Sequence, residues 1–203
     1  MDLSRRDFLA TAAALGPMGR AIADVQPGPA PLCAACVLPE SREGYRKAMA
    51  GQERRHLVVV PAAAGWDPSL AEQARDGRWV LFESAAGFGD DGSSQSQRAG
   101  LAKAFGLVVG HPRAPWREHP RPAYVQLQWP APALVRDFSS VVEVRGGQTI
   151  ATFGDLPVAA LRRVGSGAFL FLGSPLGPAL WSGDVAAHAW LASVFAAAAR
   201  RPA

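Results

Sequence analysis

Residues 56–87, HLVVVPAAAGWDPSLAEQARDGRWVLFESAAG, contain the pattern that decides the fold class. The apolar runs 57–60 and 79–82 are continuous rather than alternating, which is typical of strands buried on both faces. Between them, Asp67 and Pro68 form an N-cap followed by proline at the first helical position. Gly77 ends this helix, so the stretch predicts a parallel β-α-β unit.

The unit is extended on both sides. Ser41 predicts the N-cap of a short helix, and Ser94 with Gln97 forms a capping box for a helix ending near Phe105. Residues 107–109 predict a third strand, and the apolar stripe over 183–199 predicts a closing helix. Glycine-containing turns at 145–148 and 165–167 predict two hairpins, with strands over 141–144, 149–153, 157–164 and 168–172.

These elements predict one α/β domain over residues 54–200. We expect a flavodoxin-like three-layer sandwich, with a mostly parallel sheet and antiparallel hairpins near the C-terminal half. The length of 203 residues allows one domain plus short extensions, and 49% hydrophobic with 19% charged residues is ordinary globular composition. The net charge of +4 and the scattered arginines do not indicate a nucleic-acid surface.

Residues 1–23 carry the three parts of an export signal. Arg5 and Arg6 precede a short apolar run over 10–18, and Ala21 and Ala23 form an A-x-A cleavage pattern. The arginine pair followed by Phe-Leu resembles the twin-arginine signal of bacteria. The resemblance implies the twin-arginine translocase as a partner during export and a periplasmic or secreted destination. The apolar run is too short for a stable membrane anchor, and an ordinary amphipathic first helix is the alternative interpretation.

Residues 24–53 form a Pro-rich linker with a C-x-x-C motif and the short helix. Two cysteines exclude a disulfide-rich scaffold and a four-cysteine metal site. Cys33 and Cys36 are open to three interpretations: a structural disulfide after export, free thiols, or a redox or metal-handling function. Because Val37 follows Cys36, the motif is not one for covalent haem attachment.

A longer resemblance covers residues 54–200. The β-α-β-α-β order, then Pro157-Val158-Ala159, then RRVGSGAFLFLGS over 162–174 and a closing helix resemble the class I glutamine-amidotransferase-like family. The likeness is to its non-catalytic branches, such as domains of trehalose-utilisation-like proteins and of some β-galactosidases. The catalytic members carry a nucleophilic Cys and a later His-x-Glu. Here no Cys follows Cys36, and the late His188 lies inside the last helix without that Glu. The resemblance therefore implies an exported binding or accessory protein, with no cofactor predicted.

One loop is the best ligand-site candidate in the chain. Because ligands of open α/β sheets sit at the carboxyl ends of strands, the loop after the second strand is the expected place. Its candidate residues are Glu83, Ser84, Gly87, Asp90 and Asp91, and Ser174 in a later loop could close over the same pocket.

The same loop supports an alternative function. Ser84 with small neighbours could serve a periplasmic hydrolase as nucleophile, with His111, His119 or His188 as base. Its carboxylates, Glu83, Asp90 and Asp91, could instead do acid–base work or bind a cation. A solvated polar loop is the plainer interpretation.

A basic, proline-rich insertion occupies residues 110–122. Its histidines, His111 and His119, and Trp116 could form an anion or metal site with four arginines: Arg98, Arg113, Arg117 and Arg121. The two histidines are eight residues apart in a loop, which matches no standard metal-ligand spacing, so no metal is predicted.

The export interpretation gives a measurable mass. Protein isolated from the periplasm is expected to begin at Asp24, because cleavage follows Ala23. A Cys33–Cys36 disulfide would lower the denatured mass by about two hydrogens. Denaturing mass spectrometry before and after reduction checks both, and an uncleaved N-terminus would contradict the signal assignment.

Overall fold

The computed structural model describes residues 36–50, 56–114, 124–136 and 140–200 of the 203-residue chain. The helices are α1 (Pro39–Ala48), α2 (Ser69–Arg75), α3 (Asp91–Phe105), α5 (Gly177–Trp181) and α6 (Val185–Ala199). The strands are β1 (Leu57–Ala63), β2 (Trp79–Ser84), β3 (Val108–Arg113), β4 (Tyr124–Leu127), β5 (Ala133–Arg136), β6 (Val141–Arg145), β7 (Gln148–Phe153), β8 (Leu156–Val164) and β9 (Gly167–Leu172). None of the described helices is long and apolar enough to cross a membrane.

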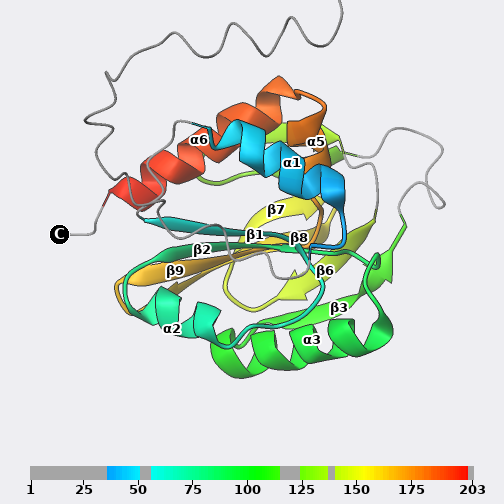
Figure 1. Cartoon of the computed structure of the whole chain (residues 1–203), viewed down its shortest axis with the longest axis vertical. Helices are drawn as coiled ribbons and strands as arrows, with labels where there is room; N and C mark the ends of the chain where they lie inside the picture. The colour runs from blue at the N-terminus through cyan, green and yellow to red at the C-terminus, as the bar shows by residue number, and fades with distance from the viewer. Residues whose placement is uncertain (1–35, 51–55, 115–123, 137–139, 201–203) are drawn as a thin grey trace, which may run out of the picture.

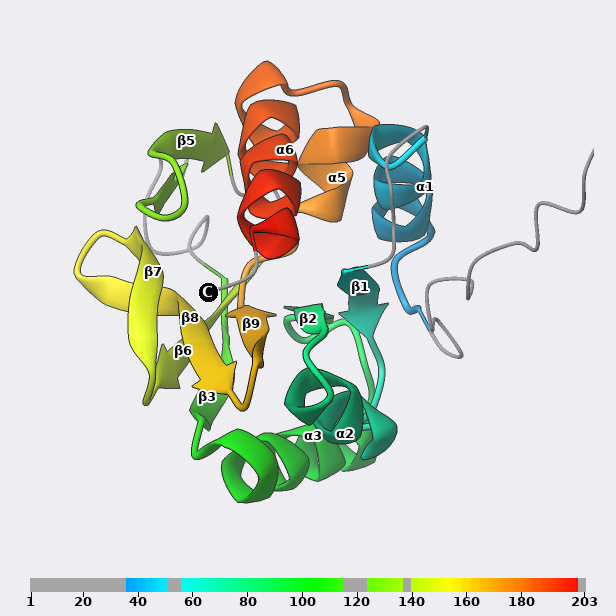
Figure 2. The ribbon, with the colours of Figure 1, turned by 90° about the vertical axis from the view of Figure 1, so that its left-hand side faces the viewer.

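A seven-stranded mixed sheet organises the described chain, in the order β1-β2-β9-β8-β7-β4-β5. Helices α1, α5 and α6 lie on one face, and α2 and α3 lie on the other (Figure 1). Figure 2 shows that the sheet curls, so that its β4–β5 end comes up beside α6. Strand β5 contacts α6 directly.

Two neighbouring interior strands, β2 and β9, explain why both faces of the sheet are covered. Successive side chains of a strand point to opposite faces, and every residue of β2 and of β9 is buried. Trp79 and Leu81 join the apolar cluster under α6, whereas Val80 and Phe82 join the cluster over α2 and α3. The prediction that residues 79–82 form a strand buried on both faces is confirmed.

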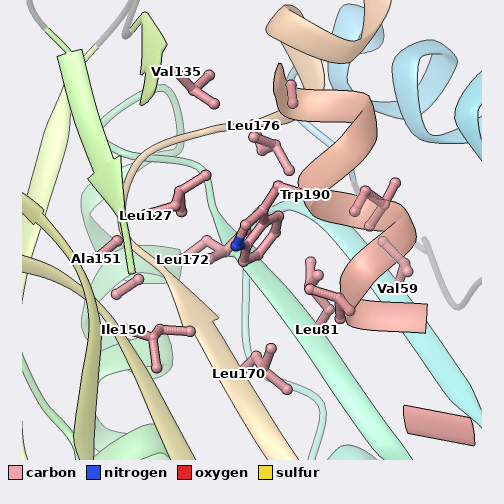
Figure 3. Close-up of a cluster of buried hydrophobic side chains, with 14 of the residues drawn as sticks. Val59, Leu81, Leu127, Val135, Ile150, Ala151, Leu170, Leu172, Leu176 and Trp190 are labelled. Carbon is pink, nitrogen blue, oxygen red and sulfur yellow. The ribbon is translucent and has the colours of Figure 1, made fainter. Parts of the chain in front are cut away.

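Helix α6 closes the first cluster with the predicted stripe. Its buried residues are Ala187, Trp190, Leu191, Val194, Phe195 and Ala198. Figure 3 shows Trp190 at the centre, between leucines of β2, β4 and β9. Its indole Nε1 donates to the carbonyl oxygen of Trp129 at 2.8 Å, so the polar atom of this buried side chain is satisfied.

The prediction of a flavodoxin-like sandwich with a mostly parallel sheet is wrong. Only the pairs β1–β2 and β2–β9 are parallel, and the other four pairs of the large sheet are antiparallel. Strand β3 does not enter this sheet and pairs with β6 instead. Strand β3 is mostly exposed, and its Pro112 has no backbone N–H to donate. The fully buried β9 therefore lies beside β2 in the large sheet.

The two predicted hairpins have different outcomes. The hairpin around Gly165 is confirmed, since β8 and β9 pair antiparallel up to Val164 and Gly167. The hairpin around Gly146 and Gly147 is wrong, because β6 pairs with β3 while β7 pairs with β8 and β4. Both glycines of that turn have positive φ, 89° and 79°, and they carry the chain from one sheet to the other.

Two of the predicted caps are also wrong. Helix α1 begins at Pro39, which leaves Ser41 buried inside the helix. Asp90, not Ser94, caps α3, because its side chain accepts from the backbone N–H of Ser93 at 2.8 Å. The helix end at Phe105 is confirmed, with Gly106 in the left-handed conformation as C-cap.

Two glycines let α1 and α5 approach each other closely. A Cβ at Gly44 would lie 2.1 Å from the carbonyl oxygen of Gly177. A Cβ at Gly177 would lie 2.3 Å from the Cα of Ser41. Both distances are far below contact, so this helix pair depends on the absence of side chains at these positions.

The contact predicts that Gly44→Ala destabilises the fold. The added methyl group meets backbone atoms that cannot move away, so we expect a loss of about 1–3 kcal/mol in the free energy of unfolding. Gly65→Ala is the control, because a Cβ there meets nothing within 4 Å. Urea denaturation measures both, and equal stability of the two variants would contradict the packing argument.

Candidate functional site

Neighbouring side chains at the end of β2 point to opposite faces of the sheet. Glu83 and Ser84 are adjacent in sequence, and both are buried. The side chain of Glu83 lies among α1 and the start of α5, whereas that of Ser84 lies against α3. The predicted ligand loop therefore divides into two separate environments, because side chains alternate along a strand.

Glu83 ties three elements together. Its carboxylate accepts from the Ser41 hydroxyl at 2.7 Å and from the backbone N–H groups of Leu176 and Gly177 at 3.0 Å each. The side chain is fully buried. A carboxylate so enclosed and so bonded has no free edge for a substrate, and its visible effect is to hold α1 and α5 on β2.

Within the described chain, the Glu83 carboxyl is bonded to neutral groups and to no lysine or arginine. Burial raises the pKa of the Glu83 carboxyl above its usual 4.5, and the hydrogen bonds from Ser41 and from the start of α5 oppose that shift. Burial and the neighbouring Glu83 charge raise the pKa of Tyr45 well above its usual 10. The Tyr45 hydroxyl makes no hydrogen bond of good geometry within the described chain, although it is buried close to Glu83.

Ser84 belongs to a second polar group, on the other face. Its Oγ donates to Gln97 Oε1 across 3.5 Å and accepts from the backbone N–H of Ala86 at 3.1 Å. Gln97 Nε2 in turn donates to the carbonyl oxygen of Ala63 at 3.1 Å. The hydroxyl is thus bonded to protein groups, and no histidine among the described residues contacts it.

A pocket opens beside this group, at the carboxyl ends of β1 and β2. We call it the strand-end pocket; it holds about 310 Å³ of space, part of it open to solvent. Its small and polar lining residues are Ala63, Ala64, Ser84, Ala85, Ala86, Gly87, Ser94, Gln97, Arg98 and Gly110. This is the edge of the sheet at which α/β proteins place their ligands.

The backbone around the strand-end pocket is strained. Ala62, next to the pocket wall, and Ala86, in the wall itself, have positive φ values of 38° and 48°, which non-glycine residues rarely adopt. The hydroxyl of Ser140 donates to the carbonyl oxygen of Ala86. A Cβ at Gly87 would lie 2.9 Å from Pro112. Contacts from distant segments therefore hold the loop after β2 in a shape that its sequence would not favour alone.

Two residues of the predicted basic cluster, Arg98 and His111, contact each other, and Arg98 also lines the strand-end pocket. Arg98 Nη1 lies 3.4 Å from His111 Nδ1. Arg98 is half-buried on α3, and His111 is exposed on β3. Arg113, also predicted for that cluster, is exposed at the end of β3. The other four predicted residues lie outside the described residues: Trp116, Arg117, His119 and Arg121.

The remaining candidate residues lie elsewhere. Asp90 Oδ1 and Oδ2 accept from the backbone and side chain of Ser93, and Asp91 is exposed in the first turn of α3. Ser174 lines a different, largely apolar hollow of about 330 Å³, with Leu127, Val135 and Leu172. His188 Nε2 lies 3.0 Å from the carbonyl oxygen of Leu180, within the α5–α6 packing.

The cysteine motif is described only in part. Cys36 Sγ donates to the carbonyl oxygen of Leu38 at 3.1 Å, and the residue forms an antiparallel bridge with Ala63. Cys33 and the signal residues Arg5, Arg6, Ala21 and Ala23 lie outside the described residues. Within the described ranges, no group of three or more His, Cys, Asp or Glu side chains could hold a metal ion.

Sequence reasoning missed three residues of these groups. Ser41 and Gln97 were interpreted as helix caps, and Tyr45 was not singled out. All three are polar and buried: Ser41 is 0%, Tyr45 2% and Gln97 5% exposed. Polar residues within the first turns of a helix are usually caps, and only the packing of α1 and α3 on the sheet shows a different role.

Comparisons with known proteins show the fold. No protein-family model and no curated protein matches the chain. A cytoplasmic protein from Salmonella typhimurium LT2 is similar over 80% of this chain and 87% of its own, at 10% identity and a TM-score of 0.54.

Two enzymes are also similar in structure. An exo-β-1,4-mannosidase from Opitutaceae bacterium strain TAV5 is 16% identical over 68% of this chain and 25% of its own, with a TM-score of 0.50. A β-galactosidase from Rahnella sp. R3 is 12% identical over 72% of this chain and 23% of its own, with a TM-score of 0.52. The chain thus spans about a quarter of these two enzymes, and the likeness shows a shared fold.

The buried carboxyl predicts a specific pH dependence. Because its folded-state pKa is raised above 4.5, the folded protein holds the Glu83 proton more tightly than the unfolded chain does. This stabilisation is present in full below pH 4.5 and is lost as the pH rises through the folded-state pKa. Glu83→Gln removes the titration, so the free energy of unfolding of wild type relative to the variant should fall as the pH rises above 4.5.

Asp90→Asn is the contrasting control. Hydrogen bonds from the Ser93 backbone and side chain lower the pKa of Asp90, so its contribution is lost as the pH falls rather than as it rises. Urea titrations at several pH values measure both differences. A difference between wild type and Glu83→Gln that stays constant with pH would contradict the raised pKa.

Proposed function

We propose that this protein is an exported, non-catalytic binding or accessory protein whose ligand site is the strand-end pocket. The main observation behind the proposal is that the two candidate catalytic side chains at the end of β2 are already hydrogen-bonded inside the protein. Glu83 is sealed by donors from α1 and α5, and the Ser84 hydroxyl is bonded to Gln97 and Ala86. A nucleophile needs a base within reach, and a general acid or base needs access to the substrate.

The strained alanines support a role in binding. Ala62 and Ala86 hold left-handed conformations at adjacent strand ends, and strain of this kind persists only where the surroundings impose it. The walls built from alanine and glycine leave the backbone open to close approach by a ligand. Export through the twin-arginine route and kinship with the non-catalytic amidotransferase-like proteins belong to the same proposal.

The hydrolase alternative has one observation in its favour. The mannosidase and the β-galactosidase contain this fold as about a quarter of their chains. The fold there is one part of a larger enzyme, while the Salmonella protein contains it as most of its length. A fold that occurs both as a minor part of enzymes and as most of a separate protein is typical of an accessory domain. We therefore prefer the accessory role to a hydrolase with Ser84 as its nucleophile.

Replacing Ser84 tests the choice between these functions. Ser84→Ala should leave the rates on p-nitrophenyl acetate and p-nitrophenyl β-galactoside at background, as for wild type, and neither protein should react with a fluorophosphonate. The variant should lose about 1–2 kcal/mol of stability, because its hydrogen bonds in the core disappear. The exposed Ser96 gives the matched control, Ser96→Ala.

A catalytic Ser84 would give a different result. The wild-type protein would then hydrolyse one of the substrates or be labelled, and Ser84→Ala would abolish this while Ser96→Ala would not. That outcome would reject the non-catalytic function.

A further inference from the structure

The rim of the strand-end pocket carries a cation without an acidic partner. Arg98 is half-buried and lines the pocket, and the contact of its guanidinium is with His111 Nδ1 at 3.4 Å. No Asp or Glu of the described chain pairs with it. A guanidinium that is partly removed from water without a carboxylate partner favours the binding of an anion beside it.

A hydroxyl donor lies on the same side of α3. Ser94 and Arg98 are four residues apart, so they are neighbours on one face of the helix, and both line the pocket. Within the described chain the Ser94 hydroxyl forms no hydrogen bond. A guanidinium and a hydroxyl side by side can satisfy both oxygens of a planar carboxylate.

Two acidic side chains next to residues of the pocket wall are already engaged, and Asp91 is exposed to water in the first turn of α3. Glu143 packs against Gly110 but accepts from Arg145 Nε at 2.6 Å. Asp90 accepts from Ser93 as the cap of α3. Within the described chain, Arg98 is the one Lys or Arg side chain that lines the pocket, and a single positive charge balances a monoanion better than a dianion such as phosphate.

We infer that the strand-end pocket binds the carboxylate group of a small molecule, with Arg98 as the counter-ion and Ser94 as a hydroxyl donor. The alanine and glycine residues of the wall leave room for the carboxylate group, and the rest of the molecule extends through the open side of the pocket. This inference rests on the proposed binding function and adds the chemical class of the ligand to it.

Titration with acetate, followed by amide NMR shifts at constant ionic strength, tests the inference. Saturable shifts are expected at Gly87 and Gly110, which line the pocket. Uncharged acetamide, which has the same shape, should produce none, and phosphate should bind more weakly than acetate. Arg98→Gln should weaken acetate binding about tenfold, because a charge-assisted hydrogen bond is lost. Ser94→Ala should weaken it less.

Lys103→Gln is the matched control, since Lys103 is an exposed residue of the same helix that does not line the pocket, and its replacement also removes one positive charge. It should leave acetate binding unchanged. Equal losses in Arg98→Gln and Lys103→Gln, or tighter binding of phosphate, would overturn the carboxylate assignment. Shifts at Gly87 and Gly110 with acetamide as well would overturn it while leaving the pocket a binding site. No shift with any probe would remove both the inference and the proposed pocket.

Discussion

The carboxylate of Glu83 is the interaction on which the described structure depends most. Within the described chain this carboxylate is buried without a lysine or arginine partner, and hydrogen bonds from Ser41 and from the backbone of Leu176 and Gly177 offset its burial. Those donors belong to α1 and to the start of α5, so both must dock on β2 at once. The close approach of Gly44 and Gly177 is the geometric condition for this. A buried carboxylate that needs all of these donors therefore makes three distant segments depend on one another.

The alternation of β2 separates this structural group from the candidate site. One residue further along the strand, Ser84 faces α3 and the strand-end pocket, where neutral polar groups bond to one another. The strained residues Ala62 and Ala86 lie at this pocket, and so does Arg98, which pairs with no carboxylate of the described chain. Backbone strain and a guanidinium that no carboxylate of the described chain pairs with are features that a ligand can explain, whereas neither improves the stability of the folded chain.

Part of the candidate site was visible in the sequence. Part of the predicted loop after the second strand lines the strand-end pocket, at the strand ends where α/β folds gather ligands. The basic cluster also contained two residues that meet, Arg98 and His111. What failed was the grouping: Glu83, Ser84 and Ser174 were expected around one pocket and lie in three different environments. The face to which each side chain of a strand points, and the path of later segments of the chain, decide which residues share a pocket. Neither can be derived from the residue types alone.

The sequence by itself determined the local elements. Continuous apolar runs indicate β1 and β2, and the glycine-containing turn at 165–167 indicates β8 and β9. The buried residues of α6 match the predicted stripe, and Gly106 marks the end of α3. These features depend on side-chain periodicity and on local backbone preference, which neighbouring residues carry. Only the tertiary structure decided that β9, not β3, lies beside β2, that the sheet is mixed and curled, and that Ser41 and Gln97 bond to distant groups. Competition among buried strands and the satisfaction of buried polar atoms are properties of the whole packed chain, so no local pattern could specify them.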